Sequence, residues 1–95
     1  MHIVEFQDLM RRTYLERDRK RGSDGVFRRL VEEIGEVART LRDDDPERRE
    51  HEFADAVAWL VSLANLTGVE LEKAAARYQG GCPKCGQIPC DCPFP

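Results

Sequence analysis

The sequence contains little that would suit a β-sheet protein, a membrane protein or a secreted protein. No segment alternates apolar and polar residues over the length of a strand, which argues against a sheet. The longest apolar segment, residues 56–66, is far shorter than a membrane span. The first ten residues, MHIVEFQDLM, lack the basic start and continuous apolar stretch of a signal peptide. We therefore expect a cytoplasmic protein that does not contact a membrane.

Cysteine is absent from the first 81 residues, and all four cysteines occur close together near the end of the chain. This distribution favours a local metal site over disulfides spread through a fold. CPKCG followed by PCDC is typical of a zinc knuckle, and four thiolates leave no coordination position open for catalysis. An iron–sulfur cluster is a less supported alternative. The predicted ligands of a structural Zn²⁺ are Cys82, Cys85, Cys90 and Cys92.

Length and charge indicate one small domain without a strong preference for nucleic acid. The chain has 95 residues, and its 15 basic and 18 acidic residues give a net charge of −3. A protein that binds the phosphate backbone normally has a basic surplus, so a nucleic-acid partner is not expected. We divide the chain into a helical domain, residues 1–79, and a cysteine tail, residues 80–95, which is too short to form its own core.

Apolar residues recur at three- and four-residue spacing through the helical domain, which predicts an all-α fold of four helices. Asp45 and Pro46 form a strong helix start, and Gly68 is a typical helix end. From Phe53 onward the third helix is apolar on nearly all sides. One small chain cannot cover such a helix, so we expect a homodimer or homotetramer that pools helices into bundles. The expected helices are residues 3–21, 25–42, 46–66 and 70–79.

Two pairs of carboxylates stand on the second and third helices, each pair spaced to share one helix face. They are Glu33 with Glu36, and Glu52 with Asp55. Antiparallel packing of the two helices would bring the pairs together, and divalent cations offset the repulsion of clustered carboxylates. An all-oxygen site suits Mg²⁺ or Mn²⁺. The alternative is that these acids merely form solvated helix faces.

These residues resemble a known family. Glu33-Ile-Gly-Glu36, a gap of fifteen residues and Glu52-Phe-Ala-Asp55 are similar to the ExxE…ExxD motif of MazG-like nucleotide pyrophosphohydrolases. The likeness covers most of residues 5–78, and the CPxCG…PCxC tail is similar to that of some small MazG-like proteins. The resemblance implies Mg²⁺-dependent hydrolysis of a nucleoside triphosphate between the α and β phosphates, for nucleotide-pool house-cleaning or control of the dNTP pool. The four acids would bind the metal, and Glu33 or Glu36 would be the catalytic base.

Two alternatives to this function remain open. Phosphoribosyl-ATP pyrophosphohydrolase shares the acidic helices of the superfamily, although the cysteine tail and the ELEKAAARY segment fit it less well. A zinc-bearing interaction or nucleic-acid-binding module, in which the acidic helices serve only as a scaffold, is the alternative outside enzymes.

Several further residues are candidates for substrate contact. Basic residues at the end of the first helix precede a glycine-containing turn and are suited to phosphate, while Trp59 and Asn65 on the third helix could stack on or read a base. By resemblance, a basic residue on the last helix, Lys73 or Arg77, also contributes. His51 is expected at the surface. The predicted substrate-binding residues are Arg17, Lys20, Arg21, Trp59, Asn65 and Arg77.

Overall fold

The computed structural model describes residues 1–94, and its regular elements are all helical. No β-strand occurs in this part of the chain, so the predicted all-α class is confirmed. A 3₁₀-helix directly follows the fourth α-helix, so the expected last helix is divided into two short elements. The elements are α1 (Ile3–Arg21), α2 (Ser23–Thr40), α3 (Pro46–Thr67), α4 (Leu71–Ala75) and η1 (Ala76–Tyr78).

The ends of α3 follow the local signals of the sequence. The Asp45 side chain accepts a hydrogen bond from the backbone N–H of Arg48 at 3.1 Å, and Pro46 occupies the first turn. At the other end, Gly68 adopts a left-handed conformation with φ of 75°. Both features are ordinary helix caps, which satisfy backbone groups that the helix itself cannot pair.

The junction between α1 and α2 is shorter than the sequence predicts. The segment Gly22-Ser23-Asp24-Gly25 reads as a four-residue turn, with α2 beginning near residue 25. In the structure α2 begins at Ser23, and Gly22 is the only residue between the helices. Its φ of 84° turns the chain sharply without a longer loop.

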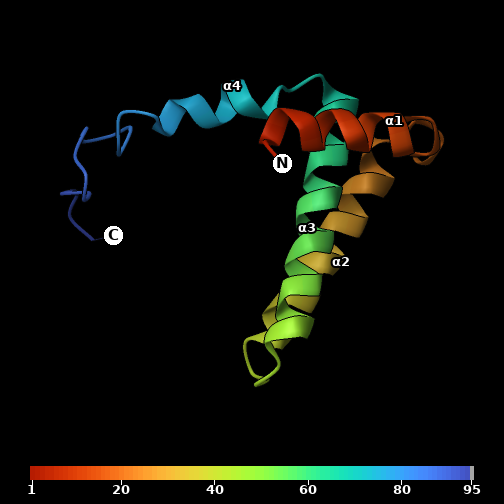
Figure 1. Ribbon diagram of the computed structural model, residues 1–95, viewed down its shortest axis with the longest axis horizontal. Helices are drawn as coiled ribbons and strands as arrows, with labels where there is room; N and C mark the ends of the chain where they lie inside the picture. Colours follow the sequence, from red (N-terminus) through yellow and green to blue (C-terminus); the bar gives the residue numbers. More distant parts are fainter. Residues whose placement is uncertain (95) are drawn as a thin grey trace.

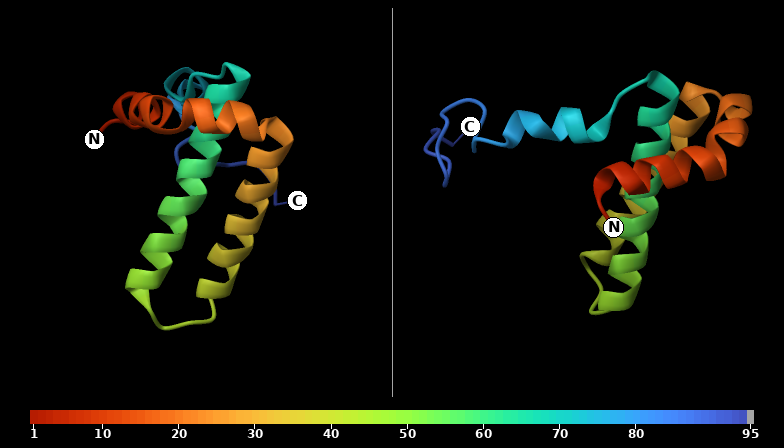
Figure 2. Two further views of the ribbon diagram at one scale, coloured as in Figure 1. Left: turned by 90° about the vertical axis from the view of Figure 1, so that its right-hand side faces the viewer. Right: turned by 45° about the horizontal axis from the view of Figure 1, so that its top comes forward.

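Helices α2 and α3 form a long antiparallel hairpin, and α1 lies across its open end (Figures 1 and 2). Helix α4 and the cysteine tail extend away from the hairpin (Figure 1). The radius of gyration is 15.7 Å, whereas a compact domain of this length has about 12 Å. The monomer is therefore open, and much of its helix surface has no neighbour within the chain.

A buried glutamine joins α1 to the corner between α3 and α4. The side-chain amide of Gln7 donates to the Asn65 side chain at 3.0 Å and to the Val69 carbonyl at 2.7 Å. Its oxygen accepts from the Leu71 backbone N–H at 2.9 Å. Asn65 in turn donates to the Gln7 carbonyl at 3.2 Å. Because the amide is shielded from water, these bonds fix α1 against the hairpin.

An arginine at the closed end of the hairpin sets the position of α2 relative to α3. The Arg49 guanidinium donates to the Thr40 carbonyl at 3.0 Å and to the Asp43 carbonyl at 2.8 Å. These carbonyls lie at and just beyond the end of α2, where backbone acceptors lack helical partners. The contact therefore fixes which residues of the two helices lie opposite one another.

The hairpin has an exposed apolar face. Apolar side chains that recur at helical spacing cover one face and remain exposed; Ile34, for example, is 57% accessible. The helical spacing puts Glu33 and Glu36 of α2, and Glu52 and Asp55 of α3, outside this apolar face. Within the described part of the chain, only Val26, Leu30, Val61 and Ala64 form a buried apolar core. The exposed apolar face consists of Phe27, Val31, Ile34, Phe53, Val57 and Leu60.

Helices α3 and α4 meet at a sharp corner. Among residues 1–94, no single helix is long and apolar enough to cross a membrane. Taken together, α3 and the α4–η1 segment have sufficient length and apolar composition, but they are bent by 108°.

Candidate active site and cysteine metal site

The hairpin brings three of the four predicted carboxylates together. Glu33 of α2 lies beside Glu52 and Asp55 of α3, and the Glu52 side chain is within hydrogen-bonding reach of Glu33. Partial burial raises the pKa of the Glu33 carboxyl, and the charges of Asp55 and Glu52 raise it further. Arg29 acts in the opposite direction but does not cancel these effects. The site therefore carries an excess of negative charge, which a divalent cation would offset.

Glu36 lies one helical turn beyond Glu33, outside this close group. Its carboxylate is 3.7 Å from the Arg39 guanidinium, and it is partly open to solvent. It shares a helix face with Glu33, as the spacing predicts. The structure thus places Glu36 next to the acidic group and with a different partner.

A histidine that the motif does not include completes the cluster on α3. The His51 Nε2 atom lies 3.4 Å from an Asp55 carboxylate oxygen. One ligand atom from each of His51, Glu52 and Asp55 lies within 4.8 Å of the other two. His51 is at the surface, as expected, but it is directed toward the acidic site. The i, i+4 spacing of residues 51 and 55 was the available signal in the sequence.

A cavity of about 210 Å³ opens beside the acidic residues, between α1 and α3. Asp55 belongs to both sites, since it also lines this cavity. Tyr14 and Arg17 of α1 form one wall, and Trp59 and Ser62 of α3 form another. A pocket with an aromatic ring, a basic group and polar groups, adjacent to a metal-type site, is suited to a nucleotide.

The position of Trp59 is defined by two arginines. The guanidinium carbon of Arg21 lies 5.0 Å from the ring centroid, and that of Arg29 lies 5.4 Å from it. Arg21 also contacts the carboxylate of Asp18 at 3.1 Å. Asp18 is only 2% exposed, so this carboxylate needs its charged partner and holds Arg21 in place. Asp18, Arg29, Tyr14 and Ser62 were not among the predicted site residues, because their contacts depend on how the helices cross.

The other predicted substrate-binding residues lie farther from the cavity. Lys20 is exposed on the last turn of α1 and does not line it. The side-chain amide of Asn65 forms hydrogen bonds with Gln7. These bonds support a structural role for Asn65 rather than a role in recognising the base. Arg77 belongs to η1, where its guanidinium lies 5.6 Å from the Tyr78 ring, beyond α4 and away from the hairpin.

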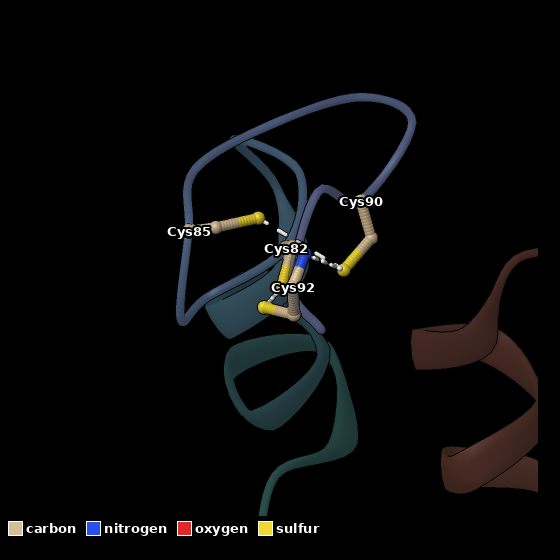
Figure 3. Close-up of side chains that lie close together, drawn as sticks. All are labelled: Cys82, Cys85, Cys90 and Cys92. Atoms are coloured by element: carbon tan, nitrogen blue, oxygen red, sulfur yellow. Dashed lines mark hydrogen bonds between the residues drawn. The ribbon is translucent and has the colours of Figure 1, made fainter. Parts of the chain in front are cut away.

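The four cysteines form a second cluster, at the far end of the molecule (Figures 1 and 3). The Cys82 and Cys92 sulfurs are 3.7 Å apart, and the Cys85 and Cys90 sulfurs are 3.9 Å apart. In a tetrahedral site with Zn–S bonds of about 2.3 Å, neighbouring sulfurs are about 3.8 Å apart. These separations therefore match four ligands of one metal ion, and all four thiols are free of disulfides.

Backbone amides around the cluster favour thiolates. The Asp91 N–H donates to the Cys85 sulfur at 3.3 Å, and the Cys92 N–H donates to the Cys90 sulfur at 3.4 Å. Hydrogen bonds from the Asp91 and Gln87 backbones lower the pKa of Cys85 to about 6. Neighbouring sulfurs, first that of Cys90, raise the pKa of Cys92 to about 11. Hydrogen bonds from the Cys85 and Lys84 backbones also lower the pKa of Cys82. Two thiols thus ionise more readily than a free cysteine, and a bound cation would favour ionisation of the rest.

Comparison with known proteins gives one family. The model of the MazG nucleotide pyrophosphohydrolase domain matches residues 21–81, which include all four motif acids and end just before Cys82. No curated protein matches the chain. The match covers more than half of the sequence and confirms the resemblance noted above. The chain therefore belongs to the MazG nucleotide pyrophosphohydrolase family.

Proposed function

We propose that this protein hydrolyses a nucleoside triphosphate between the α and β phosphates, giving a nucleoside monophosphate and pyrophosphate. One observation carries the proposal: three converging carboxylates, Glu33, Glu52 and Asp55, adjoin a cavity that contains Trp59 and basic side chains. Nucleotide-pool house-cleaning is the role that we assign to this activity.

The acidic group is suited to Mg²⁺ or Mn²⁺. Its residues supply carboxylate oxygens. Burial raises the pKa of Glu33, and the charges of Asp55 and Glu52 raise it further against the opposing effect of Arg29. We assign Glu33, Glu36, Glu52 and Asp55 as ligands directly or through water. A cation bound there would neutralise part of the phosphate charge and would lower the pKa of the attacking water.

The protein's own side chains then have separate roles. We assign Glu36, which is partly exposed and paired with Arg39, as the base that accepts the proton of the attacking water. As the oxygen of that water bonds to the α phosphorus, the bond from this phosphorus to the bridging oxygen breaks, and pyrophosphate leaves with the bridging oxygen. We assign Arg17 and Arg21 to the phosphates, and Trp59, whose ring carries the Arg21 and Arg29 guanidiniums, to the wall of the cavity that receives the nucleotide.

We further propose that the protein works as a homodimer or homotetramer. The exposed apolar face of α2 and α3 does not include the four motif acids, so a second copy can cover it without burying them directly. The open shape of the monomer supports the same assembly. A contiguous apolar surface of this kind is uncommon on a protein that remains monomeric.

For the cysteine tail we propose one structural Zn²⁺ per chain. The sulfur separations and the four-thiolate ligand set support zinc, and no ligand position remains for a substrate. Elemental analysis of protein purified without added metal should give one zinc per chain. Stoichiometric iron would replace this assignment with an iron site.

The activity is tested with a panel of nucleoside triphosphates, including deoxy, oxidised and deaminated bases, and with phosphoribosyl-ATP. Pyrophosphate release with Mg²⁺ or Mn²⁺ is the expected result, and it should be lost in Glu36→Gln. Glu50→Gln is the matched control, since Glu50 is an exposed acid of α3 outside the cluster. The proposal is wrong if no compound is hydrolysed, or if Glu36→Gln behaves like the parent. Turnover of phosphoribosyl-ATP alone would assign that activity instead.

A further inference from the structure

His51 has a position that the family motif does not explain. Its Nε2 atom faces the Asp55 carboxylate at 3.4 Å, one helical turn farther along α3. The ring is 71% exposed and is not held by packing. A surface ion pair of this kind contributes little to stability. The orientation of His51 toward the acidic site is therefore better explained by a role in binding a cation there.

The geometry permits His51 to share a cation with the neighbouring acids. One ligand atom of each of His51, Glu52 and Asp55 lies within 4.8 Å of the other two. Two ligands on opposite sides of one ion, each bound at about 2.1 Å, are about 4.2 Å apart. Small rotations of three partly exposed side chains are enough to reach this distance. Glu33 of α2, whose carboxyl is influenced by the charges of Asp55 and Glu52, is the neighbouring carboxylate on the other helix.

A nitrogen ligand changes the choice of metal. Mg²⁺ strongly favours oxygen ligands, whereas imidazole suits transition-metal ions, which bind nitrogen more tightly. We propose that His51 is a direct ligand of the cation at the acidic site, and that the site consequently prefers Mn²⁺ to Mg²⁺. This inference rests on the proposed function, in that it concerns the same metal site, but it is tested without any nucleotide.

The test measures Mn²⁺ bound to protein whose cysteine tail has been loaded with zinc, so that the thiolates do not compete. Electron spin-echo envelope modulation detects a nitrogen nucleus bonded directly to Mn²⁺. The chain has two histidines, His2 and His51, which simplifies the assignment. His51→Asn is the test variant, and His2→Asn is its control. Titrations with Mn²⁺ and with Mg²⁺ give the two affinities for each protein.

We expect nitrogen modulation in the parent and in His2→Asn, and none in His51→Asn. Loss of the ligand should weaken Mn²⁺ binding about tenfold or more, with a much smaller effect on Mg²⁺. Because His51 is exposed, the variant should fold, which circular dichroism verifies. Bound Mn²⁺ without nitrogen modulation, or equal losses of Mn²⁺ and Mg²⁺ affinity, would overturn the inference and leave the proposed hydrolase intact. No binding of either cation by the parent would refute the acidic metal site itself.

Discussion

Replacing Glu52 by glutamine should stabilise the metal-free protein and, in the same molecule, remove its stabilisation by divalent cations. Glu52 lies close to Asp55, and its charge also acts on Glu33, so it repels both carboxylates when no cation is present. Glutamine keeps the size of the side chain and removes the charge. The two effects have opposite signs, which makes them difficult to attribute to a general change in folding.

The magnitude follows from the separation of the charges. A carboxylate oxygen of Glu52 lies within 4.8 Å of one of Asp55. At that separation two carboxylates repel by about 0.9 kcal/mol in water and by about 3.5 kcal/mol at an effective dielectric constant of about 20. The Asp55 side chain is 43% exposed, so solvent screening places the gain near the lower value, about 1 kcal/mol. For a domain of this size, that gain raises Tm by about 4–8 °C. The parent should gain about 2.7 kcal/mol from a cation at 100 times its Kd, and the variant should gain almost none.

Thermal unfolding with and without Mg²⁺ or Mn²⁺ measures both effects, at one protein concentration because self-association also changes Tm. The pH dependence gives a further check. Since the pKa of Glu33 is raised from its ordinary value of 4.5, the folded metal-free protein holds more protons than the unfolded chain. Its stability should therefore fall as pH rises from 4.5 through the raised pKa, and less steeply in the variant.

Two results would refute this reasoning. A lower Tm for the metal-free Glu52→Gln protein would mean that the carboxylate stabilises the fold. An unchanged response to cations would mean that Glu52 does not contribute to a metal site. Glu50→Gln, which alters an exposed acid on the same helix, should change neither quantity.

Three other predictions concern the fold and assembly. Gln7→Leu should lower the free energy of unfolding by about 2–4 kcal/mol in urea denaturation, because the three hydrogen bonds of the buried Gln7 side chain are lost. A decrease below about 0.5 kcal/mol, the size typical of surface sites, would contradict this prediction. Ile34→Lys places a charge on the exposed apolar face and should reduce the particle mass in light scattering to that of a monomer; an unchanged mass would exclude this face as the interface. Cys85→Ser should abolish stoichiometric zinc while leaving the helical circular dichroism intact, since the tail lies apart from the hairpin; a large loss of helix would show that the tail supports the fold.

The parts of the fold with strong local signals could be predicted from the sequence. Asp45 and Pro46 at the start of α3 and Gly68 at its end determine the backbone locally, so those boundaries were found. The start of α2 was misplaced because the Ser23-Asp24-Gly25 segment has the composition of a turn. Gly22 alone makes that turn, and its positive φ is a property of the folded backbone.

In the candidate site, too, features with a local signal could be predicted, and features that depend on how the helices cross could not. Spacing predicted that Glu33, Glu52 and Asp55 would meet, because helical periodicity assigns residues to faces. Spacing did not predict the cavity beside them, because the contact of Trp59 with Arg21 requires the crossing of α1 over α3. Spacing also did not show that Asn65 has a structural role rather than a role in substrate binding. The hydrogen-bond partner of Asn65 is Gln7, which lies 58 residues away in the chain.

The single residue between α1 and α2 also constrains which changes in chain length the protein tolerates. An insertion beside Gly22 would rotate α1 by about 100° relative to α2 and shift it by about 1.5 Å, carrying Arg21 away from Trp59. The loop at residues 41–45 connects α2 and α3 at the other end of the hairpin, far from this contact. A change in the length of that loop does not rotate α1. Among relatives of this chain, length variation should therefore accumulate at the hairpin loop and be rare at the α1–α2 joint.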